Sequence, residues 1–136
     1  MRRRVDQMGL GGRVIMTGFR RDIPEVMAAL DVLVLPSTRS EATSQVIPQA
    51  LAVGTPVAAA ATGGIPEIVR DGETGRLVAP GDAGALARAV LSLLDDPQRA
   101  REMALAGQAL IRHRYSADAS MTATTDVYRR LLEGRL

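Results

Sequence analysis

The chain has 136 residues, of which 46% are apolar, and its formal net charge is +2. Such a chain suits one domain over residues 1–136, and its apolar content excludes a disordered segment. The small net charge and the scarcity of aromatic residues, 2%, argue against a nucleic-acid-binding surface. The chain has no Cys, which excludes disulfides and thiolate metal sites, and its single His cannot form a His-based metal site.

Membrane and secretion signals are missing from the sequence as well. No apolar run reaches the roughly 18 residues that a transmembrane helix needs. The basic residues 2–4 are not followed by the apolar stretch of a signal peptide. We therefore expect a cytoplasmic protein without a transmembrane segment.

The first third of the chain alternates predicted helices and strands. Residues 2–9 favour a short helix, and the apolar run 13–17 predicts a buried strand. Asp22 and Glu25 have the spacing of a capping box, so a second helix is expected to start there. The run 31–36 is apolar between turn signals and predicts a central parallel strand that is covered on both faces.

The middle of the chain continues this alternation. A polar loop over residues 37–43 leads into a predicted helix over 44–53. Residues 56–60 predict another short strand, and Pro66 suits the first turn of a short helix. A turn rich in Gly then leads into a last predicted strand over residues 76–79.

The remainder of the sequence predicts three helices. Asp82, Asp96 and Ser116 are the expected N-cap residues, and Pro97 suits the first position of the second of these helices. Apolar residues recur on one face of the first and the last helix. They are Leu86, Val90, Leu93 and Leu94 in the first, and Met121, Tyr128, Leu131 and Leu132 in the last.

Strands that alternate with helices indicate βαβ units and an α/β fold. We therefore predict a Rossmann-like, doubly wound parallel sheet with C-terminal helices. The sequence offers about four strands, whereas a doubly wound nucleotide-binding domain usually has about six. The sheet is accordingly expected to be incomplete.

The loop after the strand at 31–36 is the best candidate for a ligand site, because such sheets bind ligands beyond the carboxyl ends of their strands. This loop carries Glu41 and runs into a helix start, where the N–H groups of Thr43, Ser44 and Gln45 would be free to bind a diphosphate. The hydroxyls of Thr43 and Ser44 either add hydrogen-bond donors or cap the helix.

Gln49 lies about five residues into the same helix, roughly 7 Å from its start. Glu41 and Gln49 would therefore flank an anion site, which suits an elongated ligand with hydroxyls at both ends, such as a nucleotide-sugar. The alternative interpretation is a helix-capping Glu41 and a surface Gln49. Glu67 is more simply explained as a surface carboxylate.

Five blocks of sequence occur in the order and spacing of a known family: DVLVLPS (31–37), EATSQVIPQALA (41–52), GTPV (54–57), GGIPE (63–67) and DGETGRLV (71–78). Together they resemble the group 1 glycosyltransferases, which are retaining enzymes with the GT-B fold. The similarity continues to the final helix. The resemblance implies that the chain corresponds to the C-terminal, donor-binding half of a GT-B architecture.

The resemblance implies roles for individual residues. The first Glu of a family carboxylate pair contacts the donor sugar, and Glu41 matches it. The backbone amides that hold the diphosphate match those of Thr43, Ser44 and Gln45. The second Glu, which usually binds the ribose diol, is replaced by Gln49, and an amide cannot make the charge-assisted hydrogen bonds of a carboxylate.

The resemblance also places the nucleobase near Gly18 and Phe19. It implies no metal and no cofactor, with the nucleotide-sugar donor bound as a substrate. No residue of the chain is predicted to be catalytic, because the catalytic region and acceptor site of the family belong to an N-terminal domain that has no counterpart here.

The first strands and a basic residue of the family's donor domain have no counterpart in this sequence either. The isolated chain is therefore expected to be inactive, with exposed strand edges that favour self-association. A full enzyme of this family is compatible with peripheral membrane association.

Two other interpretations stay open at this stage. One is a non-catalytic binding or self-associating interaction module derived from such a domain. The other is a two-domain sugar-nucleotide epimerase, although such a protein should lack the block from Glu41 to Gln49.

Overall fold

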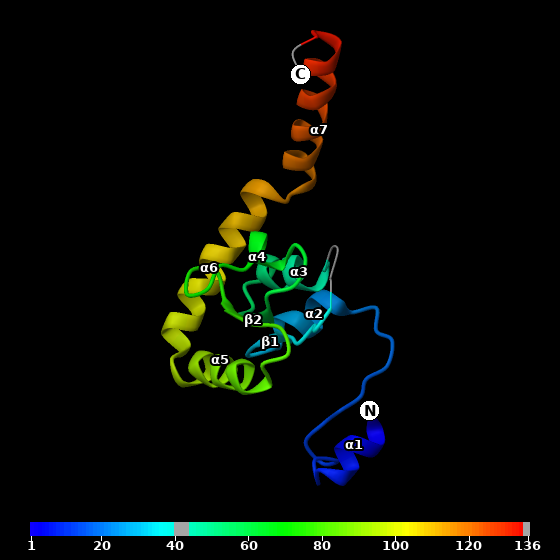
Figure 1. The fold of residues 1–136 in the computed structure, drawn as a ribbon, viewed down its shortest axis with the longest axis vertical. Coiled ribbons are helices and arrows are strands. Elements are labelled where there is room, and N and C mark those ends of the chain that lie inside the picture. Colours follow the sequence, from blue (N-terminus) through cyan, green and yellow to red (C-terminus); the bar gives the residue numbers. More distant parts are fainter. Residues whose placement is uncertain (40–43, 135–136) are drawn as a thin grey trace.

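The computed structural model describes residues 1–39 and 44–134, and Figure 1 shows its arrangement. The elements in chain order are α1 (Arg2–Gln7), α2 (Ile23–Ala28), β1 (Leu33–Leu35), α3 (Val46–Ala52), β2 (Val57–Ala60), α4 (Ile65–Ile68), β3 (Arg76–Val78), α5 (Ala83–Asp95), α6 (Pro97–Arg114) and α7 (Ala117–Leu132). Helices and strands therefore alternate as far as β3, and three helices follow.

The described residues form one parallel sheet with the strand order β1-β2-β3. Leu33 is paired with Val57, and Ala59 is paired with Leu77. These strands confirm the predicted strands at 31–36, 56–60 and 76–79. All three run in the same direction, so their carboxyl ends meet at one edge, where a ligand site is expected.

Helices cover both faces of the sheet, as expected for a doubly wound fold. On one face, Leu51 of α3 and Ile111 of α6 pack in a cluster with Val57 and Ala59 of β2. On the other face, Leu93 of α5 packs near Ala58, which points the opposite way from its neighbours in β2. Residues 57–60 are all buried.

The predicted strand at 13–17 is not part of the sheet. It lies in an extended segment between α1 and α2, away from the body of the molecule in Figure 1, and the Ile15 side chain is 86% exposed. An apolar run supplies the side chains of a strand but not the neighbouring strand with which its backbone must pair. The described part of the sheet therefore has three strands rather than about four.

The caps of the last three helices confirm the sequence predictions. The Asp82 carboxylate accepts from the Ala85 N–H at 2.7 Å, and the Asp96 carboxylate accepts from the Arg99 N–H at 2.9 Å. The Ser116 hydroxyl accepts from the N–H of Ala119 at 3.2 Å. Each bond satisfies one of the N–H groups that a helix start leaves without an internal partner.

Asp22 is the N-cap residue of α2, as predicted, but the hydrogen bond of the predicted capping box is absent. Asp22 precedes α2, but within the described chain its carboxylate makes no capping bond to that helix. It pairs instead with the guanidinium of Arg20, whose Nε donates to it at 2.9 Å, and this hydrogen bond holds the pKa of the Asp22 carboxyl below its ordinary value. The Asp22 carboxylate is therefore bonded to the Arg20 guanidinium instead of to a backbone N–H at the start of α2.

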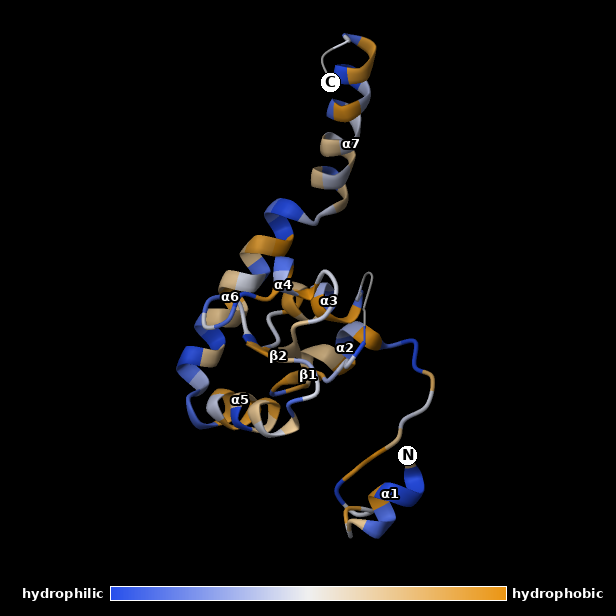
Figure 2. Cartoon of the chain, viewed as in Figure 1, coloured by the Kyte–Doolittle hydropathy of each residue, from blue (hydrophilic) through white to orange (hydrophobic). Residues whose placement is uncertain are grey.

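Helix α7 extends away from the body and touches it mainly through the end of α6 (Figure 1). None of residues 117–132, all within the described part, is buried. The apolar face predicted for this helix is therefore present but uncovered, and Figure 2 shows apolar turns on the projecting helix. No helix in the described ranges is long and apolar enough to cross a membrane.

Candidate functional site

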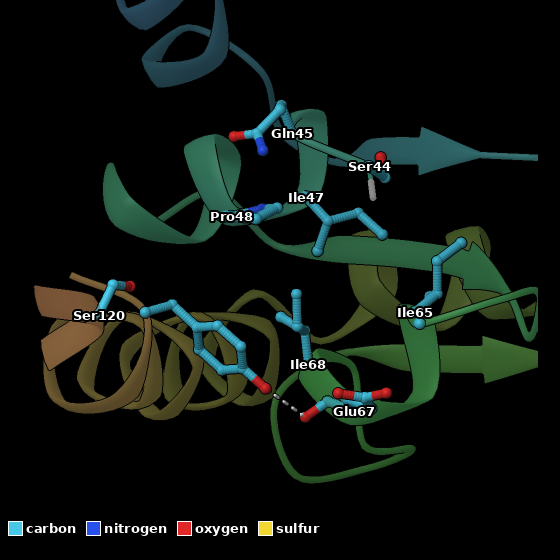
Figure 3. Close-up of a pocket in the computed structure, with 10 residues that line it drawn as sticks. Ser44, Gln45, Ile47, Pro48, Ile65, Glu67, Ile68 and Ser120 are labelled. Carbon is cyan, nitrogen blue, oxygen red and sulfur yellow. Dashed lines mark hydrogen bonds between the residues drawn. The ribbon is translucent and has the colours of Figure 1, made fainter. Parts of the chain in front are cut away.

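A hollow of about 340 Å³ lies where the start of α3 faces α4 and the junction of α6 with α7 (Figure 3). Ser44 and Gln45 lie on one side of it, and Glu67 and Ser120 lie on the other. The lining residues are Ser44, Gln45, Ile47, Pro48, Gly64, Ile65, Glu67, Ile68, Tyr115 and Ser120. The lining combines the apolar side chains of Ile47, Ile65 and Ile68 with polar groups from the residues on the two sides.

The start of α3 borders this hollow and carries backbone N–H groups without a partner among the described residues. The helix begins at Val46 with Gln45 as its N-cap, two residues later than predicted, and no side chain in the described part caps it. Within the same ranges, no carbonyl accepts from the N–H groups of Gln45, Val46 or Ile47. Pro48 follows them and has no N–H. These three amides and the positive end of the helix dipole favour an anion.

On the opposite side of the hollow, a hydrogen bond joins two segments that are distant in the sequence. The Tyr115 hydroxyl donates to the backbone carbonyl of Glu67 at 3.4 Å, and a dashed line marks this bond in Figure 3. The Glu67 carboxylate itself is exposed. Tyr115 also packs against the main apolar cluster, so α6 supports both α4 and the hollow.

The predicted site residues are only partly brought together. Ser44 and Gln45 line the hollow, whereas Gln49 is exposed on α3, one turn beyond Gln45, and is not part of the lining. Glu41 and Thr43 fall outside the described residues. Their proposed contacts with a donor therefore stay predictions.

Gly18 and Phe19 lie on the extended segment before α2 and do not line the hollow. The Phe19 side chain is 89% exposed. Tyr115 and Ser120 line the hollow, although no functional role was predicted for either of them. Two sequence features could have pointed to Tyr115. It is one of three aromatic residues, and it directly precedes the cap at Ser116. Among the described residues, no cluster of three or more His, Asp or Glu side chains is arranged to hold a metal ion.

The sequence profile of the family described as Glycosyl transferases group 1 matches residues 1–96. The chain belongs to this family of glycosyltransferases. Among curated proteins it is 39% identical over 120 residues to a 2-deoxystreptamine N-acetyl-D-glucosaminyltransferase from Streptomyces fradiae. That alignment covers 87% of this chain but 28% of the relative, so the chain spans little more than a quarter of it.

Solved structures agree with this assignment. HepE from Anabaena, solved in complexes with UDP and with UDP-glucose, is 34% identical and matches with a TM-score of 0.86 over 93% of this chain and 35% of its own. Sucrose-phosphate synthase from Thermosynechococcus elongatus is 34% identical, with a TM-score of 0.89 over 98% of this chain and 34% of its own. The predicted Rossmann-like fold within a GT-B architecture is confirmed.

Proposed function

We propose that this glycosyltransferase chain binds the nucleotide-sugar donor of a retaining transfer reaction, without a metal ion or cofactor and in the cytoplasm. The observation that carries the proposal is the start of α3 at the edge of a hollow, which no side chain in the described part of the protein caps. A diphosphate requires hydrogen-bond donors and positive potential, and a helix start supplies both without a charged side chain.

The complexes of HepE support this proposal. HepE is 34% identical to the chain and has been solved with UDP and with UDP-glucose. We assign the diphosphate to the amides around Gln45, with Thr43 and Ser44 contributing from the preceding loop. Glu41 is assigned to the sugar hydroxyls and Gln49 to the ribose, while the assignment of the nucleobase to Gly18 and Phe19 remains a prediction.

Acceptor binding and transfer are assigned to sequence that this chain does not match. The chain spans about a third of the structures that it resembles and little more than a quarter of the Streptomyces fradiae relative. We therefore propose that the 136-residue chain binds donor but does not transfer sugar by itself. The sugar acceptor would be bound by a separate acceptor domain, as in a two-domain GT-B enzyme.

Glu41→Ala is expected to weaken binding of the sugar-bearing donor selectively. Titration calorimetry with a panel of nucleoside diphosphates and their sugar conjugates first identifies the donor that the unmodified chain binds. Loss of a charged hydrogen-bond acceptor should then weaken that donor about tenfold to a hundredfold. The matching nucleoside diphosphate lacks the sugar, so its affinity should change little.

Glu73→Ala is the matched control for this experiment. Glu73 is an exposed carboxylate on the turn before β3, and within the described chain it forms an ion pair with Arg70 at 3.6 Å. Removal of such a surface pair should leave donor affinity unchanged. Equal weakening by both substitutions, or no binding of any panel member to the unmodified chain, would overturn the proposal and favour an interaction module.

Gln49→Glu is expected to strengthen nucleotide binding about threefold to tenfold. A carboxylate at this position accepts hydrogen bonds from both hydroxyls of a ribose diol, and charged acceptors bind more strongly than neutral amides. The gain should disappear with a 2′,3′-dideoxynucleotide, which lacks the diol. A gain of the same size with both nucleotides in calorimetry would show that Gln49 does not face the ribose.

A further inference from the structure

Three threonine side chains are buried in the described part of the chain, and two of them have a clear structural role. The Thr55 hydroxyl donates to the Met27 carbonyl oxygen at 2.7 Å. The Thr74 hydroxyl donates to the carbonyl oxygen of Ile68 at 2.8 Å and accepts from the Arg70 N–H at 2.9 Å. Each of these hydroxyls joins two parts of the chain, as buried polar groups usually do.

Thr62 is the third, and its hydroxyl has no hydrogen-bond partner among the described residues. The residue is 7% exposed, and its Oγ1 atom is buried. Both of its backbone groups are bonded, because the N–H donates to the Ala60 carbonyl at 2.8 Å and the carbonyl accepts from the Ile65 N–H at 3.1 Å. The hydroxyl has lost its bonds to water without gaining a partner, which disfavours folding. Such a group in a native structure indicates a role other than packing.

Thr62 lies where a ligand of this fold is expected. The central strand β2 ends at Ala60, so Thr62 is two residues beyond its carboxyl end. Gly64 and Ile65, which follow in the chain, line the hollow beside the start of α3, and Figure 3 labels Ile65. The Cα atoms of Thr62 and Gly64 are at most about 7 Å apart, because only one residue separates them. The unpartnered hydroxyl is therefore close to the hollow.

Rotation about one bond can turn this hydroxyl toward a ligand. The Oγ1 atom is covered, and the small exposed surface of Thr62 belongs to its other atoms. Rotation about the Cα–Cβ bond exchanges the hydroxyl with the methyl group and leaves the backbone in place. Because no hydrogen bond holds the Thr62 hydroxyl, the rotation breaks none. The same rotation at Thr55 or Thr74 would break an existing hydrogen bond.

We propose that Thr62 is a further binding residue for the donor, and that its hydroxyl donates to a phosphate oxygen of the nucleotide-sugar. This role rests on the proposed function of the hollow as a donor site. The diphosphate is the part of the donor assigned to this edge of the sheet, and its charged oxygens accept stronger hydrogen bonds than neutral groups do. The hydroxyl thus gains on binding the partner that it lacks in the fold.

Thr62→Val is expected to weaken donor binding without loss of stability. Valine has the shape of threonine but no hydroxyl, so the melting temperature should stay the same or rise when the unpartnered group is removed. Calorimetry uses the donor pair that the panel identifies, beginning with UDP and UDP-glucose, the ligands with which HepE has been solved. Both members of the pair should bind about tenfold more weakly.

Two comparisons assign the contact to the phosphates. Thr62→Ser keeps the hydroxyl and should bind donor within about threefold of the unmodified chain. The diphosphate is common to both ligands, so Thr62→Val should weaken both, whereas Glu41→Ala is expected to weaken only the sugar-bearing one. Weakening of the sugar-bearing donor alone by Thr62→Val would overturn the phosphate contact.

Thr55→Val is the matched control, because it makes the same chemical change at a buried threonine before the amino end of β2. It leaves the Met27 carbonyl without this donor, so the melting temperature should fall by at least about 3 °C while donor affinity stays unchanged. A lower melting temperature with unchanged affinity in Thr62→Val would indicate an ordered water as the partner and overturn the proposal.

The outcomes also separate this role from the proposed function. Unchanged affinity in Thr62→Val, when the unmodified chain binds donor, contradicts the role of Thr62 alone. If no member of the panel binds to the unmodified chain, the donor site itself is wrong, and the role of Thr62 falls with it.

Discussion

Leu51→Ala is expected to lower the free energy of unfolding by about 2 to 5 kcal/mol. Leu51 lies in the middle of α3, is fully buried and packs in the main cluster against β2 and α6. Truncation removes apolar contacts and leaves a cavity that neighbouring helices can fill only in part. Urea denaturation followed by circular dichroism measures the loss.

A substitution at Gly107 tests the packing around Leu51 more specifically. A Cβ at Gly107 would lie 2.6 Å from a methyl group of Leu51, so α3 and α6 approach closely only because Gly107 has no side chain. Gly107→Ala alone should therefore destabilise the protein by about 1 to 3 kcal/mol. In the Leu51→Ala background the added methyl fills part of the cavity, and the two losses should not add. Additive losses would show that the helices do not touch at this point.

Gly75→Ala is expected to lower the free energy of unfolding by about 2 to 3 kcal/mol. A Cβ at Gly75 would lie 2.8 Å from the backbone carbonyl oxygen of Val57 and 3.1 Å from a methyl group of Val69. The first contact is with the central strand β2, which is held on both sides by neighbouring strands. The strand cannot move aside as a flexible side chain can, so overpacking should be costly.

Gly84→Ala is the matched control for that substitution. Its Cβ would meet only the ends of the Arg88 and Asp82 side chains, both at 3.5 Å, in the first turn of α5. Alanine favours a helix over glycine, so stability should be unchanged or rise by up to about 1 kcal/mol. Thermal unfolding of the two variants should therefore shift in opposite directions, and equal destabilisation would contradict the packing seen at Gly75.

Much of the fold could be predicted because its signals are local. The caps at Asp82, Asp96 and Ser116 depend on residues three positions away, and the sequence predicts each of them. The strand at 56–60 was equally clear, because a short apolar run between turns suits a buried strand. Such signals do not depend on residues that are distant in the sequence.

The wrong predictions concern features that depend on distant or competing partners. Residues 13–17 have the composition of a strand, but strand formation depends on a neighbouring backbone that no local pattern specifies. Asp22 has the spacing of a cap, but Arg20 pairs with it instead. The sequence predicts the apolar face of α7 correctly but does not show that the rest of the described chain leaves it uncovered.

The residues of the candidate site also fall into those that local sequence signals predict and those that they do not. Ser44 and Gln45 could be predicted because a helix start after a central strand is a local feature. Tyr115 and Ser120 could not, because they reach the hollow from a part of the chain about seventy residues later. Roles for Glu41 and Gln49 came from the family pattern, and the binding experiments above test them.

We expect a donor diphosphate to bind at the start of α3. The most direct test is a nuclear magnetic resonance titration of the ¹⁵N-labelled chain with the nucleoside diphosphate that calorimetry identifies. The largest shifts are expected at the amides of Gln45, Val46 and Ile47, because these N–H groups would donate to the phosphates. Saturating shifts confined to α5 or α7, with these three amides unmoved, would contradict it.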